Sequence, residues 1–184
     1  MGYGWEFLIK NRADWGGGDF RDVMAGVDEL VRRGVADPDR LGIGGWSYGG
    51  YMAAWAITQT RRFKAAVVGA GMSDLASEFG TESVGSAAYD RWYYGVPYEK
   101  PEGFVKSSPV TYVKKARTPT LILHGEKDDV DPIGQAQQFH RGLRYYEVPC
   151  EFVIYPRAGH GLTEERHQVD SLRRIVRWFE TYLK

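Results

Sequence analysis

Short apolar runs alternate along the chain with segments that have apolar residues at helical spacing, and this alternation most constrains the fold. The apolar runs are too brief for helices, so each indicates a buried strand. Strands separated by helices pair in parallel, and parallel sheets are covered by helices on both faces. The sequence therefore predicts an α/β protein with strands over residues 41–46, 63–68, 120–123 and 151–155.

Helical spacing indicates four helices around these strands. We expect them over residues 19–31, over 53–57, from Pro132 to 143, and as a long closing helix whose apolar positions run from 169 to 183. Proline is favoured in the first turn of a helix, which suits a start at Pro132. Ligands bind at the carboxyl ends of parallel strands, so functional side chains should follow the four strands directly.

Residues 45–49 read Gly-Trp-Ser-Tyr-Gly, between the first predicted strand and the helix after it. A serine on so tight a turn is held in a strained conformation with its hydroxyl above the sheet. Glycines at both ends of the pattern would avoid collisions with the neighbouring strand and helix. The pattern predicts Ser47 as a nucleophile; a buried structural serine in a glycine-rich turn is the alternative.

A nucleophilic serine needs a base and an acid that orients the base. His160 is the favoured base, because it follows the last strand and is flanked by glycines. His140 and His167 fall within predicted helices, and His124, which ends the third strand, is a weaker rival.

The acid should come from the loop after the third strand, which holds Asp128, Asp129 and Asp131. Their spacing alone does not choose among them. We expect two of the three to be solvated loop residues or a cap of the following helix.

Residues 89–104 contain six aromatic residues between the second and third predicted strands. We expect Trp92, Tyr93 and Tyr94 to form an apolar pocket for the acyl part or a side chain of the substrate. Packing of a long loop onto the body of the protein is an equally weighted alternative.

The composition excludes several classes of protein. With 24 basic and 24 acidic residues among 184, the chain has no basic surplus for nucleic acid. Its apolar runs are too short to cross a membrane, and its start lacks the pattern of a secretion signal. The single cysteine, Cys150, fits a reducing compartment, so we expect a cytoplasmic protein. One cysteine and four scattered histidines predict no metal site, and we expect no cofactor.

Five segments spread over the whole chain form a specific pattern: residues 14–19, 45–52, 108–112, 118–126 and 155–161. This pattern resembles the catalytic domain of the prolyl oligopeptidase family of serine peptidases, in its acylaminoacyl-peptidase and dipeptidyl-aminopeptidase-like branch. The resemblance implies an α/β-hydrolase fold, Ser47 as nucleophile, His160 as base and the N–H of Tyr48 as an oxyanion donor. The family's acid stands four residues before the proline that opens the next helix, which implies Asp128.

The resemblance also implies parts that the sequence lacks. In the family, further strands and a tyrosine that supplies a second oxyanion donor precede the position of Met1, and a β-propeller commonly precedes them. We therefore expect residues 1–184 to form a single, partial α/β-hydrolase domain without the N-terminal strands. Residues 41–46 would then be an apolar sheet edge, through which we expect a homodimer or higher oligomer.

The predicted function is a serine hydrolase that cleaves acyl-aminoacyl or aminoacyl bonds of short peptides through an acyl-enzyme. A carboxylesterase acting on small esters is the first alternative, because activated esters need less transition-state stabilisation than amides. A catalytically weak or silent domain whose role is association is the second.

Overall fold

The computed structural model describes residues 2–184, and these residues contain one four-stranded parallel sheet. Its strands are β1 (Gly42–Trp46), β2 (Ala65–Gly69), β3 (Thr120–Gly125) and β4 (Cys150–Tyr155), in the spatial order β1-β2-β3-β4. Neighbouring strands pair in parallel throughout. The predicted strands and the α/β class are confirmed, with strand ends within two residues of those expected.

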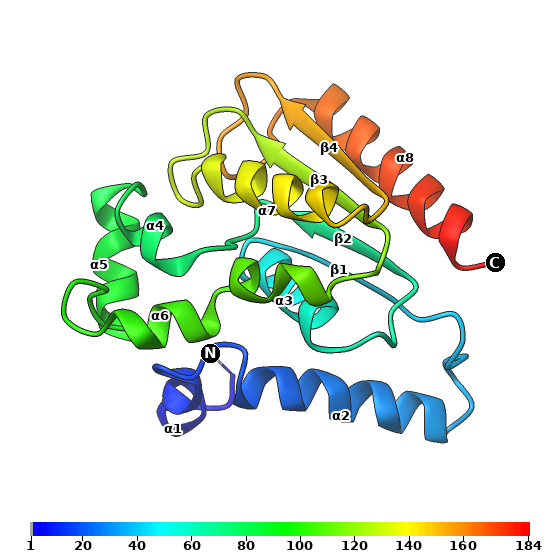
Figure 1. Ribbon diagram of the computed structural model, residues 1–184, viewed down its shortest axis with the longest axis horizontal. Coiled ribbons are helices and arrows are strands. Elements are labelled where there is room, and N and C mark those ends of the chain that lie inside the picture. Colours follow the sequence, from blue (N-terminus) through cyan, green and yellow to red (C-terminus); the bar gives the residue numbers. More distant parts are fainter. Residues whose placement is uncertain (1) are drawn as a thin grey trace.

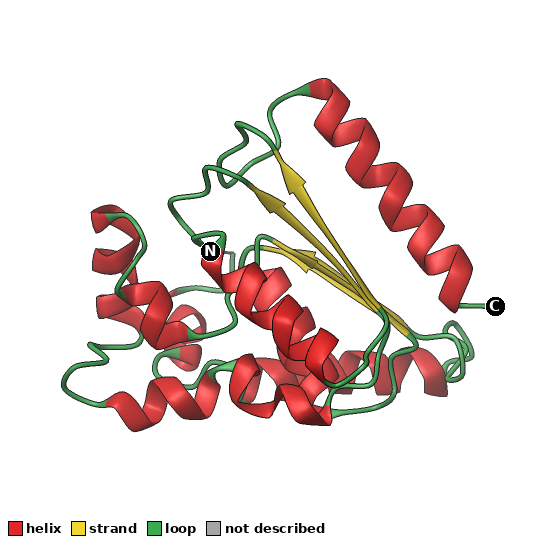
Figure 2. Ribbon diagram, turned by 45° about the horizontal axis from the view of Figure 1, so that its top comes forward, coloured by secondary structure: helices red, strands yellow, loops and turns green. Residues whose placement is uncertain are grey.

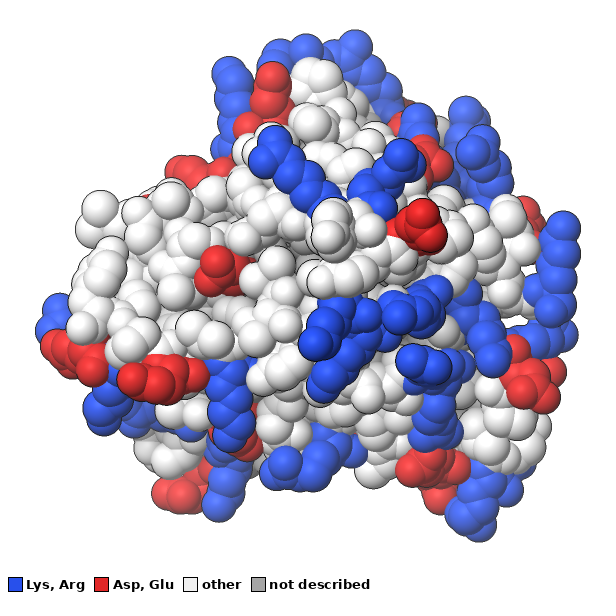
Figure 3. Space-filling model, in the orientation of Figure 1, with Lys and Arg blue, Asp and Glu red and all other residues white. Residues whose placement is uncertain are grey.

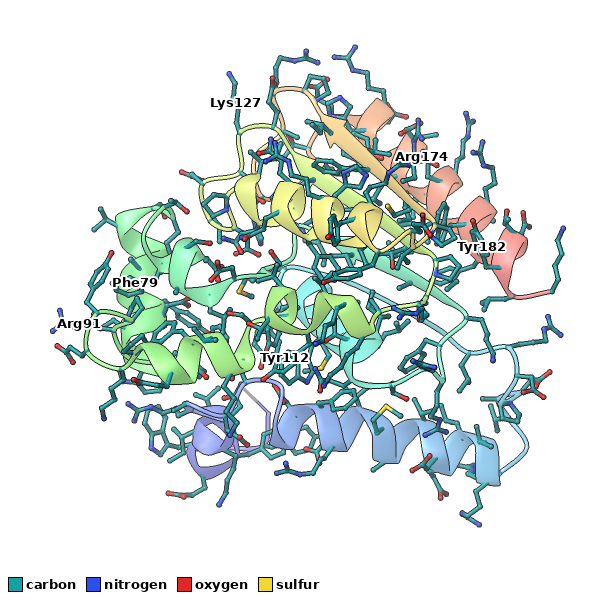
Figure 4. The ribbon with its side chains drawn as sticks, viewed as in Figure 1. Phe79, Arg91, Tyr112, Lys127, Arg174 and Tyr182 are labelled. Carbon is teal, nitrogen blue, oxygen red and sulfur yellow. The ribbon has the colours of Figure 1, made fainter. Side chains whose placement is uncertain are left out.

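Helices cover both faces of this sheet. On one face lie α3 (Tyr48–Gln59) and α7 (Gly134–Tyr145), and on the other lies α8 (Glu165–Tyr182), as Figures 1 and 2 show. Helix α2 (Gly18–Arg32) lies beside α3, further from the sheet. Arg174 of α8 reaches β4, where its guanidinium forms an ion pair with Glu151 (Figure 4).

The two faces of the sheet follow the alternation of side chains along each strand. Ala66, Val68 and Ile122 pack against α3 and α7, whereas Val67 and Leu121 pack in the cluster that includes α8. All five are nearly or fully inaccessible to solvent. Burial of a valine or leucine side chain contributes roughly 1.5–3 kcal/mol, so both helical layers are held mainly by apolar contact.

A helical lobe projects from the body between β2 and β3. It comprises α4 (Leu75–Phe79), α5 (Val84–Tyr93) and α6 (Pro101–Ser107), and the 3₁₀ helix η2 (Pro109–Lys115) leads from it to β3. In Figure 1 the strand arrows point towards the side where α4 and α5 lie, and Figure 4 shows Phe79 in this lobe. This stretch was expected to be a long loop, and its three helices correct that expectation.

The lobe helices are short and depend on caps and ring contacts. Asp74 accepts hydrogen bonds from the first turn of α4, and Ser83 accepts one at the start of α5. The Phe104 ring lies 4.8 Å from that of Tyr94 and 6.4 Å from that of Phe79, measured between centroids. Such helices have too few turns to show a clear helical period in the sequence.

The chain begins with the short helices α1 (Trp5–Leu8) and η1 (Ile9–Asn11), which lie beside the lobe. Within residues 2–184, every helix is too short or too polar to cross a bilayer. On the face drawn in Figure 3, positive and negative side chains are interspersed, in line with the equal numbers of acidic and basic residues.

Strand β1 pairs only with β2 within the described residues, so its other side is a sheet edge. Unpaired backbone groups at an edge are available to another strand. We expect this chain to associate with itself at micromolar concentration, with a mass that rises with concentration in size-exclusion chromatography with light scattering. A monodisperse monomer over the whole concentration range would contradict this expectation.

Candidate active site

Ser47 occupies the turn between β1 and α3 in a backbone conformation that side chains rarely adopt, with φ 59° and ψ −123°. Such a conformation costs roughly 1–3 kcal/mol and persists only where the surrounding structure enforces it. The N–H of Ser47 donates to the carbonyl of Gly69 at 2.9 Å, which fixes the turn to the end of β2. The Ser47 hydroxyl makes no hydrogen bond within residues 2–184 and lines a cavity.

Close backbone contacts on both sides of Ser47 require glycine. A Cβ on Gly45 would lie 2.5 Å from the backbone of Gly49, and one on Gly50 would lie 2.3 Å from the carbonyl oxygen of Gly69. A Cβ on Gly49 would meet nothing within 4 Å. The steric need that the sequence analysis assigned to Gly49 therefore belongs to its neighbour Gly50, which packs α3 against β2.

The imidazole of His160 is paired with Asp128. Its Nδ1 lies 3.0 Å from Oδ2 and 3.2 Å from Oδ1 of Asp128, whose side chain is fully buried. Oδ1 also accepts the backbone N–H groups of Val130 and Asp131, each at 3.0 Å. The hydrogen bond to Asp128 raises the pKa of His160, because it favours the protonated ring.

Backbone contacts between the loops after β3 and β4 bring these two residues together. The N–H of Lys127 donates to the carbonyl of Ala158 at 2.8 Å, and a Cβ on Gly125 would lie 2.1 Å from the carbonyl oxygen of Gly159. The indole N–H of Trp46 donates to the carbonyl of His160 at 2.7 Å, so the residue before Ser47 is joined to the histidine loop.

The other candidate acids lie elsewhere. Asp129 is exposed to solvent, whereas Asp131 is only 4% exposed and lines the cavity. The expectation of a solvated loop residue or a helix cap therefore holds for Asp129 but is wrong for Asp131, which is buried and does not cap α7.

Among the other histidines, His124 has a structural position that the sequence analysis missed. It is fully buried, its Nε2–H donates to the carbonyl of Asp131 at 2.7 Å, and Nε2 lies 3.4 Å from Oδ2 of Asp128. Burial lowers the pKa of His124, which favours the neutral ring, and its hydrogen bond to Asp131 braces the loop that carries Asp128. His140 and His167 lie in α7 and α8, as predicted.

Tyr48 is the first residue of α3, and its backbone and its side chain have different surroundings. Its backbone N–H has no partner within residues 2–184, and its hydroxyl donates to the carboxylate of Asp19 in the first turn of α2. Its ring meets that of Trp15 edge-on, with centroids 5.2 Å apart. Residues 14–19 therefore hold the side chain of Tyr48 beside the turn of Ser47.

A cavity of about 990 Å³ opens beside Ser47. Its lining combines rings with acidic groups; the rings are Tyr3, Phe7, Trp15, Tyr48, Tyr89 and Tyr93, and the acids are Asp19, Asp22, Glu78, Glu82, Asp90 and Asp131.

Of the three predicted pocket aromatics, only Tyr93 lines this cavity. Trp92 instead lies under the guanidinium of Arg12, 4.6 Å from its ring centroid. The hydroxyl of Tyr94 donates to Oγ of Ser107 at 2.6 Å, inside the lobe. The aromatic residues thus divide between cavity wall and lobe packing, in line with both of the weighted alternatives.

Three acidic residues converge in the cavity wall, and the sequence analysis did not single them out. Carboxylate oxygens of Glu78, Glu82 and Asp90 all lie within 4.8 Å of one another. Burial raises the pKa of Glu82 to about 8 and that of Asp90 to about 6, and it also raises the pKa of Glu78. Their positions on a helix, a turn and a second helix give no regular spacing that would have revealed the cluster.

A parallel sheet covered by helices on both faces, with a serine on a strained turn between a strand and a helix, is typical of the α/β-hydrolase fold. The sequence matches the prolyl oligopeptidase family over residues 1–184. The chain belongs to the prolyl oligopeptidase family.

Individual relatives agree with this assignment. The uncharacterized peptidase YuxL of Bacillus subtilis is 40% identical over 99% of this chain, which spans 28% of that relative. An acylaminoacyl peptidase of Pyrococcus horikoshii superposes with a TM-score of 0.93 at 30% identity, over 99% of this chain and 30% of the other. A puromycin-hydrolyzing peptidase of Mycobacterium tuberculosis superposes with a TM-score of 0.94 at 32% identity, over 100% of this chain and 28% of the other. The chain thus spans less than a third of the length of these relatives.

Gly50→Ala tests the packing of α3 against β2. Its Cβ would lie 2.3 Å from the Gly69 carbonyl oxygen and force the helix and strand apart. We expect the free energy of unfolding to fall by about 1–3 kcal/mol in urea denaturation. Gly49→Ala is the matched control, since its Cβ has open space, and we expect no loss of stability. Equal losses in both variants would contradict the steric argument.

Asp128→Asn tests the role of the carboxylate at His160. Only the neutral imidazole accepts a proton, and Asp128 raises the pKa of His160 above its ordinary value of 6.5. We expect kcat/KM to rise with pH through that raised pKa and then level off. In Asp128→Asn we expect the midpoint at lower pH and a plateau lower by about 10⁴-fold, because the amide favours the wrong tautomer. Asp129→Asn, at an exposed position, is the control, and we expect it to change the midpoint and the plateau of the pH profile only slightly.

Proposed function

We propose that this chain carries the catalytic site of a serine peptidase that cleaves acyl-aminoacyl or aminoacyl bonds of short peptides. The observation that carries the proposal is the strained conformation of Ser47, at φ 59°, in a turn whose preceding residue, Trp46, is hydrogen-bonded to His160, a histidine already paired with a buried carboxylate. A structural serine would not need this combination of backbone strain, free hydroxyl and oriented imidazole.

In the proposed mechanism, Oγ of Ser47 attacks the carbonyl carbon of the substrate while Nε2 of His160 takes its proton. Nδ1–H of His160 stays on the Asp128 carboxylate, which fixes the tautomer and stabilises the imidazolium that forms. The hydrogen bond from Oγ to Nε2 would form as the substrate binds, since such bonds are often loose in the free enzyme.

The negative charge that develops on the substrate oxygen needs donors at that oxygen. The N–H of Tyr48 has no partner among the described residues and lies at the start of α3, where the helix dipole adds positive potential. The tetrahedral intermediate then expels the amine, which takes its proton from His160. Water, activated by the same imidazole, hydrolyses the acyl-enzyme and restores Ser47.

The substrate class rests on the relatives and on the cavity. The solved relatives, an acylaminoacyl peptidase and a puromycin-hydrolyzing peptidase, support an amide or acyl-amide substrate. A cavity of about 990 Å³ beside Ser47 has room for residues of a short peptide.

Labelling with a fluorophosphonate tests the nucleophile. We expect covalent labelling of the native chain and none of Ser47→Ala, detected by intact mass spectrometry. Turnover of aminoacyl or acyl-aminoacyl anilides would then support a peptidase, whereas turnover of nitrophenyl esters alone would select the esterase. Absence of labelling at Ser47 would overturn the proposed function.

A further inference from the structure

Four acidic side chains lie in the cavity wall but have no role in the proposed chemistry. They are Glu78 on α4, Glu82 in the turn after it, Asp90 on α5 and Asp131 in the loop between β3 and α7. Glu78, Asp131 and Asp90 are 1%, 4% and 7% exposed. The same cavity is lined by Ser47.

Part of this acidic cluster lacks hydrogen-bond partners. Oε2 of Glu78 and Oδ2 of Asp131 are buried and accept no hydrogen bond within residues 2–184. The ion pairs of the described residues also leave out all four carboxylates. Buried carboxylates are normally paired, so unpaired ones that line a cavity indicate that a ligand supplies the missing partner.

Hydrogen bonds attach the acidic cluster to the loop of the catalytic acid. The N–H of Asp131 donates to Oδ1 of Asp128 at 3.0 Å. The N–H of Ser83, at the start of α5, donates to the carbonyl of Asp129 at 2.7 Å. The cluster is thus held against the same loop that orients His160.

A second set of contacts fixes α4. The side-chain oxygen of the buried Gln135, on α7, accepts the N–H groups of Ser73 and Asp74 at 2.9 and 2.8 Å. Asp74 in turn caps α4, which carries Glu78. Contacts with α7 and the Asp74 cap therefore hold the helix that carries Glu78 in place.

The size and surroundings of the cluster suit an organic cation. Oxygens of Glu78, Glu82 and Asp90 lie within 4.8 Å of one another, and acceptors around an ammonium ion stand about 4.6 Å apart when each N–O distance is about 2.8 Å. Tyr89 and Tyr93 line the same cavity, and rings of this kind suit an alkyl stem and attract a cation.

In a peptidase, the pocket beside the nucleophile receives the side chain of the residue whose carbonyl is attacked, and an acid in that pocket selects a basic side chain. We propose that Glu78, Glu82, Asp90 and Asp131 form the end of a specificity pocket for lysine or arginine at this residue. The inference rests on the proposed function of Ser47 as the nucleophile, and it adds the substrate preference that the aromatic residues left open.

The test compares acetyl-Ala-Lys, acetyl-Ala-Arg and acetyl-Ala-norleucine coumarylamides, together with the same three compounds with a free amino terminus. Norleucine keeps the four-carbon stem of lysine and removes its charge. We expect kcat/KM for lysine or arginine to exceed that for norleucine by about 100-fold or more, with or without the acetyl group. The lysine and arginine arms show which cation fits better.

Substitutions then assign the preference to the acidic cluster. In Glu78→Gln and Glu82→Gln we expect the ratio of kcat/KM for lysine over norleucine to fall by about tenfold or more. Asp22→Asn, an exposed acid on the same cavity wall, is the control and should leave the ratio within about twofold. Circular dichroism verifies that each variant folds.

A pair of inhibitors gives a readout that does not depend on turnover. We expect acetyl-Leu-Leu-argininal to bind native protein more tightly than acetyl-Leu-Leu-norleucinal, and Glu78→Gln to remove most of that difference. Equal rates for lysine and norleucine in a protein that fluorophosphonate labels at Ser47 would overturn the inference and leave the proposed function intact.

Two further outcomes would also overturn the inference. In one, turnover depends on the free amino terminus instead of the side chain, and Glu78→Gln removes that dependence. In the other, Ca²⁺ or Mg²⁺ binds stoichiometrically in calorimetry, Glu78→Gln abolishes the binding, and the preference for lysine is absent. If Ser47 is not labelled and no substrate is cleaved, the proposed function and the inference fail together.

Discussion

Backbone-to-backbone packing at the carboxyl edge of the sheet is the constraint on which the rest of this structure depends. At Gly50 the start of α3 lies against the end of β2, and at Gly125 the loop after β3 lies against the loop after β4. Neither contact leaves room for a side chain. Main-chain contacts therefore hold the turn of Ser47 against β2 and the loop of His160 against the loop after β3, and the indole N–H of Trp46 adds a side-chain link between the two.

The buried carboxylates of this edge experience opposite environments. Asp128 accepts hydrogen bonds from two backbone N–H groups and lies beside the imidazoles of His124 and His160, and these contacts stabilise a negative charge on its carboxylate. Glu78 has a buried oxygen that finds no hydrogen-bond partner in residues 2–184, and its pKa is raised by burial and by neighbouring acids. The first arrangement suits a permanent anion that orients a base. The second suits a site that is completed only when a positive group arrives.

The strands and the serine turn could be predicted from the sequence, whereas the helices of the lobe could not. Apolar runs and glycines marked all four strands and the turn of Ser47, since these features depend on local spacing. The helices α4, α5 and α6 escaped prediction because they are short and depend on caps such as Asp74. Spacing also gave no indication that Asp131 turns inward, because burial on a loop is decided by contacts with residues far away in the chain. For the same reason the convergence of Glu78 and Asp90 could not be read from the sequence.

The attachment of the lobe has a consequence for how such a protein can change. Main-chain groups make several of its links to the body: the N–H of Ser83 to Asp129, the N–H of Val110 to the carbonyl of Ser73, and the Tyr51 hydroxyl to the carbonyl of Ser107. These links involve no atom of the side chains at positions 78, 82 and 90. Point substitutions at these positions can therefore change the proposed side-chain preference without breaking the contacts that hold Ser47 and His160. Recognition and chemistry in this fold are therefore separable modules that can evolve at different rates.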